Sequence, residues 1–75
     1  MTETGGPRSL DSATSATIIH WGGDTLGVDY RFPSGDREVH ALGPDDRLIL
    51  DRLRRAGQLD YIDDDVRRRY VAKLK

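Results

Sequence analysis

The chain has 75 residues, a formal net charge of −1 at pH 7 and no cysteine. That length allows one small domain, and the missing cysteines exclude disulfide bonds and thiolate metal sites. No apolar run approaches the roughly 20 residues that span a bilayer, and the N-terminus lacks a signal peptide's basic and apolar regions, so we expect a cytoplasmic protein with no membrane partner. Arginine outnumbers lysine ten to two and aspartate outnumbers glutamate eleven to two, which is typical of a high-GC bacterium or its phage.

The first segment of the chain, residues 1–16, is rich in Thr, Ser, Gly and Ala. Beyond Met1 its only large aliphatic residue is Leu10. Such a composition buries too little apolar surface to offset the entropy lost on ordering. The pattern therefore predicts a flexible N-terminal tail, followed by a single domain over residues 17–75.

Three strands are predicted next, over residues 17–21, 25–32 and 37–42. The first is β-branched and aromatic, and the second alternates apolar Leu26, Val28, Tyr30 and Phe32 with Gly27, Asp29 and Arg31. Period-two alternation indicates a strand with one buried face. The intervening segments are Gly22-Gly23-Asp24 and Pro33-Ser34-Gly35-Asp36. Both are turn signals, so the three strands should form an antiparallel meander.

Two helices are predicted over residues 44–56 and 60–74. Pro44 suits a first helical position, Gly57 suits a C-terminal cap, and the apolar positions between them form a core-facing stripe. In the second helix we expect Asp60 to be the N-cap, with Ile62, Val66, Tyr70 and Leu74 facing inward. The predicted fold class is thus α+β: a three-stranded antiparallel meander followed by two α-helices, in the order βββαα.

The titratable residues give no sign of catalysis. His20 and His40 are too few for a zinc site, and the acidic run 63–65 lacks the alternating spacing of a calcium loop. That run is better explained as acid at the positive end of a helix dipole. We expect no catalytic, cofactor-binding or metal-binding residues, and therefore no enzyme activity and no cofactor.

The C-terminal segment carries the strongest signal for binding. Residues 66–75 contain five basic side chains and no acid, and interfaces favour Trp, Tyr and Arg. The partner-binding candidates are Trp21, Tyr61, Arg67, Arg68, Arg69, Lys73 and Lys75. The leading hypothesis is a non-enzymatic protein-interaction module, a small regulatory or accessory protein whose partner is another protein or a second copy of itself, bound through the open sheet edge or the helix pair.

The alternative is a nucleic-acid-binding transcriptional regulator that uses the basic C-terminal helix. The two predicted helices have about the lengths found in a helix-turn-helix. Carboxylates over residues 60–65 would lie where such a helix meets base edges, and the whole chain is not basic. Protein binding is therefore favoured over nucleic-acid binding.

Overall fold

The computed structural model describes residues 10–74. They form a single 3₁₀ turn (η1, Leu10–Ser12), the strands β1 (Ser15–Gly22), β2 (Thr25–Arg31), β3 (Arg37–Ala41) and β4 (Leu59–Tyr61), and the helices α1 (Pro44–Arg55) and α2 (Asp64–Leu74). The four strands make one mixed sheet in the order β3-β2-β1-β4. β1–β2 and β2–β3 pair antiparallel, whereas β4 runs parallel to β1. The α+β class is confirmed, with one strand more than the sequence predicted.

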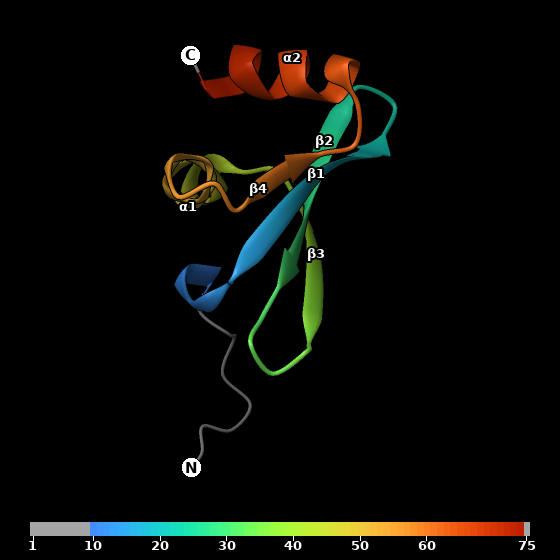
Figure 1. Cartoon of the computed structure of the whole chain (residues 1–75). Helices are drawn as coiled ribbons and strands as arrows, with labels where there is room; N and C mark the ends of the chain where they lie inside the picture. The colour runs from blue at the N-terminus through green and yellow to red at the C-terminus, as the bar shows by residue number, and fades with distance from the viewer. Residues whose placement is uncertain (1–9, 75) are drawn as a thin grey trace.

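Both helices lie on the same side of the sheet, and the core fills the space between (Figure 1). The buried hydrophobic residues are Ala16, Ile18, Leu26, Val28, Tyr30, Phe32, Leu50, Leu53, Val66 and Tyr70. The apolar face expected on the second strand is therefore the floor of the core. The opposite face of the sheet has no helix over it (Figure 1). Neither helix of residues 10–74 is long and apolar enough to cross a membrane.

The fourth strand replaces the predicted start of the second helix. Helix α1 ends in a Schellman motif, in which the amide of Gln58 donates to Leu53 O at 2.8 Å and that of Gly57 donates to Arg54 O at 3.1 Å. Gly57 adopts φ +75°, which turns the chain back so that residues 59–61 lie beside β1. The prediction of a helix over residues 60–74 was therefore too long.

The N-cap prediction was wrong by three positions. Asp63, not Asp60, precedes the first turn of α2, and its Oδ1 accepts the amide hydrogen of Val66 at 2.8 Å. Both aspartates satisfy the same compositional rule for a cap. Parallel pairing of Asp60 with Thr17 of β1 removes it from the helix.

The N-terminal boundary also differs from the prediction. β1 begins at Ser15, and Ala16 is fully buried, while Leu10 and Ala13 pack against the core. Residues 10–16 are thus part of the folded structure, because pairing with β2 and β4 supplies the burial that their own composition lacks. Residues 1–9 of the predicted tail lie outside the described residues, as does Lys75.

The turn and cap signals were otherwise informative. Gly23 and Gly35 take φ +52° and +94° in the two hairpin turns, and α1 begins at Pro44. Polar contacts that the sequence did not reveal hold the start of α1 against the sheet. The buried hydroxyl of Tyr30 donates to Asp46 Oδ1 at 2.8 Å, and the other carboxylate oxygen accepts the amide of Gly43 at 3.1 Å.

Candidate partner-binding site

The edge strand β4 presents backbone groups on its outer side. Ala16 is paired with Leu59, and the amide of Ala16 donates to Gln58 O at 3.3 Å. In a parallel ladder this register turns the backbone of Asp60 toward β1 and that of Leu59 and Tyr61 away from it. β4 is the last strand of the sheet. Leu59 and Tyr61 therefore offer their N–H and C=O groups to an added strand.

A groove of about 520 Å³ runs along this edge. It is lined by Arg54 at the end of α1, by Leu59, Asp60, Tyr61 and Ile62, and by Asp63, Asp64 and Arg67 around the start of α2. We call this the β4 groove. Its most prominent apolar side chain is Ile62, which is 56% exposed. The groove thus combines an unpaired strand edge with an exposed aliphatic side chain.

Tyr61 lines the β4 groove, and Tyr70 lies in the core behind it. The rings of Tyr61 and Tyr70 meet at 5.6 Å between centroids with a 60° tilt. Burial raises the pKa of Tyr61, while the neighbouring Arg54 and Arg67 act in the opposite direction. Tyr70 is fully buried, and its hydroxyl lies near the Arg54 guanidinium without a hydrogen bond of good geometry within residues 10–74. The contact between the two rings therefore holds Tyr61 against the core.

Some charged side chains around the β4 groove have a polar partner within the protein, and others do not. Arg54 Nη2 donates to Asp51 Oδ1 at 2.7 Å, and Asp63 is occupied as the cap of α2. Asp60 and Arg67 are exposed and have no ion pair with any other side chain of residues 10–74. Asp64, which also lines the groove, is likewise exposed and has no ion pair within residues 10–74, so these three side chains are available to a ligand of opposite charge.

The structure divides the predicted partner-binding residues among several surfaces. Tyr61 and Arg67 line the β4 groove, whereas Arg68 lines an adjoining hollow of about 340 Å³ on α2 with Arg67 and Val71. Lys73 is exposed near the end of the same helix, beside the start of α1. They therefore do not form one patch.

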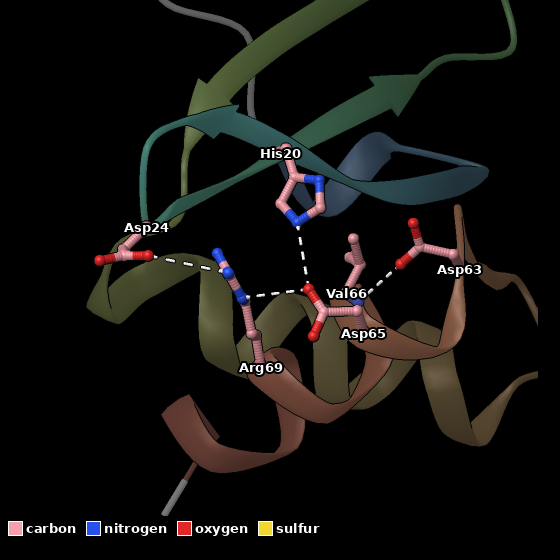
Figure 2. A network of polar contacts seen from close by, with 6 residues as sticks. All are labelled: His20, Asp24, Asp63, Asp65, Val66 and Arg69. Carbon is pink, nitrogen blue, oxygen red and sulfur yellow. Dashed lines mark hydrogen bonds and ion pairs between the residues drawn. The ribbon is translucent and has the colours of Figure 1, made fainter.

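The Arg69 side chain points toward the β1–β2 turn. Figure 2 shows it between Asp65 and Asp24, with Nε 3.4 Å from Asp65 Oδ2 and Nη2 3.7 Å from Asp24 Oδ1. His20 Nε2 lies 3.6 Å from the same Asp65 oxygen. The Nη1 atom of Arg69 is buried without a hydrogen-bond partner among the described residues. This network joins α2 to β1 and to the β1–β2 turn, a role that sequence spacing did not suggest.

Trp21 lies on the uncovered face of the sheet and is 49% exposed. Its ring covers Gly27, where an added Cβ would lie 2.7 Å from Trp21 Cε3 and 3.1 Å from His40 O. A side chain at position 27 would therefore displace the indole. On the same face Asp29 is buried beneath Arg37, whose Nη2 donates to Asp29 Oδ2 at 2.6 Å. Trp21 and the β4 groove are thus separate surfaces.

Comparison with known proteins adds no relative: no family model, curated protein or solved structure matches the chain. Within residues 10–74 no three His, Asp or Glu side chains gather as a set that could hold a metal ion. The geometry of the β4 groove is therefore the main guide to function.

Proposed function

We propose that this chain is a non-enzymatic interaction module, a small cytoplasmic regulatory or accessory protein that binds an extended segment of another protein in the β4 groove. The observation that carries the proposal is the outward-facing backbone of Leu59 and Tyr61 beside the exposed Ile62. Strand addition of this kind draws affinity from main-chain hydrogen bonds and specificity from side-chain contacts.

The charges of the β4 groove define the partner's chemistry. An added strand places one of its side chains next to Asp60, on the face of the sheet away from the helices. Asp60 makes no ion pair with any side chain of residues 10–74. A lysine or arginine of the bound segment satisfies that carboxylate, and an aliphatic residue covers Ile62. The proposed ligand is an extended segment with β-branched or aliphatic residues and one basic residue.

A peptide selection tests this proposal. Peptides from a random displayed library are selected on the wild-type protein and then measured against Ile62→Asp and Leu48→Asp. Both changes place a carboxylate at an exposed aliphatic position, but Leu48, which is 74% exposed, lies on α1 outside the β4 groove. We expect Ile62→Asp to weaken binding about tenfold or more and Leu48→Asp to leave it unchanged.

Hydrogen exchange on the same complexes locates the binding site. Bound peptide should slow exchange at the amides of Leu59 and Tyr61, because they become donors to the added strand. Peptides that bind equally well to both variants, or that leave these two amides unprotected, would show that binding does not take place in the β4 groove.

Nucleic-acid binding is a second candidate, supported by the outer face of α2. Arg67 and Arg68 line one hollow there and have no ion pair with other side chains of residues 10–74. Binding of a labelled DNA duplex should then fall steeply between about 50 mM and about 200 mM salt. It should also fall in the Arg67→Glu, Arg68→Glu double variant. No gel shift at the lower salt concentration would exclude this candidate.

A further inference from the structure

The second free edge of the sheet belongs to β3. The amide of Leu42 donates to Leu26 O at 2.8 Å and that of Phe32 donates to Asp36 O at 3.0 Å. The register Val28↔His40 and Tyr30↔Glu38 continues the same alternation. The backbones of Glu38 and His40 therefore face β2, and those of Arg37, Val39 and Ala41 face outward. No strand of residues 10–74 pairs with this outer side.

We propose that two copies of this chain pair antiparallel along β3, with Val39 at the two-fold axis, and so join their two sheets into one. In this register Val39 meets the partner's Val39, and Arg37 meets the partner's Ala41. All three outward-facing residues of each protomer then exchange backbone hydrogen bonds. A two-fold axis requires a self-complementary edge, and the side chains of β3 meet that requirement.

Glu38 and His40 of β3 are complementary in this register, as a carboxylate and an imidazole that can form a hydrogen bond. Glu38 faces the partner's His40, and His40 faces the partner's Glu38. These are non-hydrogen-bonded pairs, in which opposing side chains approach most closely, about 4.5 Å between Cα atoms. Within one protomer His40 Nε2 already lies 3.1 Å from Glu38 Oε1. Pairing thus brings together two Glu38 and two His40 side chains, and each carboxylate lies opposite an imidazole.

Other registers of the same edge are poorer. A slip of two residues toward Arg37 places Glu38 opposite the partner's Glu38, and a slip the other way places His40 opposite the partner's His40. Each slip leaves an outward-facing residue unpaired, and the first also places two carboxylates directly opposite each other, which is destabilising. A slip of one residue turns an inward-facing backbone toward the partner and breaks the ladder. The complementary register is therefore also the one with most hydrogen bonds.

The uncovered face of the sheet adds an apolar contact at the axis. Val39 lies on that face and is 42% exposed, so it covers the partner's Val39 across the junction. The paired segment is only five residues long. We therefore expect a weak dimer, detected at high micromolar concentration, rather than an obligate one.

Sedimentation equilibrium across a concentration series tests the dimer with Val39→Pro and Val39→Thr. Proline removes an outward-facing N–H with which no strand of residues 10–74 pairs, so the fold is retained, as circular dichroism would show. Two intersubunit hydrogen bonds are lost, and the dimer Kd should rise about tenfold or more. Threonine keeps the N–H and the β-branched shape, so Val39→Thr should dimerise nearly as the wild type does.

A charge exchange tests the register without altering the backbone. His40→Glu clusters four carboxylates at the junction and should weaken the dimer about tenfold. Adding Glu38→Lys to His40→Glu makes the opposing pairs Lys–Glu and should restore it. Both variants lose the edge-to-face contact of His40 with Tyr30, at 5.8 Å, so that loss is matched between them.

Three results would overturn the proposal. One is a wild-type protein that stays monomeric up to several hundred micromolar. Another is a dimer that Val39→Pro leaves intact, which would place the interface elsewhere. The third is a double variant no stronger than His40→Glu, because the side chains of positions 38 and 40 would then not face each other.

Discussion

The two edges of the sheet offer similar backbone groups in different surroundings. At β3 the outward residues are Arg37, Val39 and Ala41, and the proposed self-pairing places Glu38 opposite the partner's His40. At β4 the outward residues are Leu59 and Tyr61. Antiparallel self-pairing that uses both of them places Asp60 opposite the partner's Asp60, which is unfavourable. One edge thus favours a second copy of the chain, whereas the other disfavours it.

The partner that an edge strand favours therefore depends on the elements beside the strand as much as on its backbone. β4 is flanked by the end of α1 and the start of α2, whose side chains form the walls of the β4 groove. β3 lies away from both helices, so its specificity comes from its own side chains (Figure 1). Four variants or conditions separate the contribution of the helices from that of the strands.

The largest effect is expected where α2 supports β4. Tyr70→Ala removes a fully buried ring that contacts Tyr61, and the free energy of unfolding should fall by about 3–5 kcal/mol in urea denaturation. Tyr70→Phe is the matched control. Its lost hydroxyl makes no hydrogen bond of good geometry within residues 10–74, although Arg54 lies near it, so stability should change by about 1 kcal/mol or less. A large loss in the phenylalanine variant would contradict this account of the hydroxyl.

A smaller loss is expected where α1 meets the strands. Asp46→Ala leaves the buried hydroxyl of Tyr30 and the amide of Gly43 without their acceptor. The free energy of unfolding should therefore fall by about 1–3 kcal/mol. Asp45→Ala removes an exposed acid from the same helical turn and should cost only roughly 0.3–1 kcal/mol at low salt. Equal losses would show that charge, rather than the buried hydrogen bonds, matters there.

Alkaline pH should destabilise the fold through its tyrosines. Burial, followed by the contact with Asp46, raises the pKa of Tyr30, and burial also raises the pKa of Tyr61 and of Tyr70. The folded state therefore keeps protons that the unfolded chain releases above about pH 10. Stability is fully present below that pH and falls as pH rises further, by up to about 1.4 kcal/mol per pH unit for each tyrosine.

Urea denaturation at about pH 9 and about pH 11 measures this dependence. Tyr30→Phe should reduce the slope while lowering the stability at the lower pH, because its bond to Asp46 is lost. An unchanged slope in that variant would assign the alkaline effect to Tyr61 and Tyr70, on the β4 side of the sheet.

The smallest loss is expected at the start of α2. Asp63→Ala removes the acceptor for the amide of Val66, and the free energy of unfolding should fall by about 1 kcal/mol. Asp64→Ala, one residue later, is the control because its carboxylate has no such bond in the structure. If both changes cost the same, Asp63 acts through the helix dipole rather than as a cap.

Periodic and compositional signals explain how much of the fold was predictable. Alternation marked the buried face of β2, Gly35 marked the β2–β3 turn, and Pro44 and Gly57 bounded α1 within a residue or two. These signals are local, since each depends on side-chain periodicity or on φ at one position. β4 has only three residues, which is too short for any period to show, and its Asp60 resembles a helix cap.

The candidate site was predictable only in part. Composition identified Tyr61 and Arg67, which the fold brings together in the β4 groove. The same reasoning grouped Arg69 with its neighbours, although its guanidinium lies toward Asp24 and Asp65 (Figure 2). Ile62 was assigned to the inward face of a helix, yet it is exposed just before α2 begins. The difference at Ile62 follows from where α2 starts, which depends on β4 pairing with β1.

Local sequence patterns were enough to predict the strands and helices with strong periodicity, their turns, and the apolar face that forms the floor of the core. Each of those follows from interactions among residues close together in the chain. The tertiary structure decided that residues 59–61 join β1, that Ser15 and Ala16 belong to the sheet, and that β3 and β4 are its two edges. The physical reason is that a backbone hydrogen bond between distant segments carries no side-chain period, so only assembly of the whole sheet shows which edges remain unpaired.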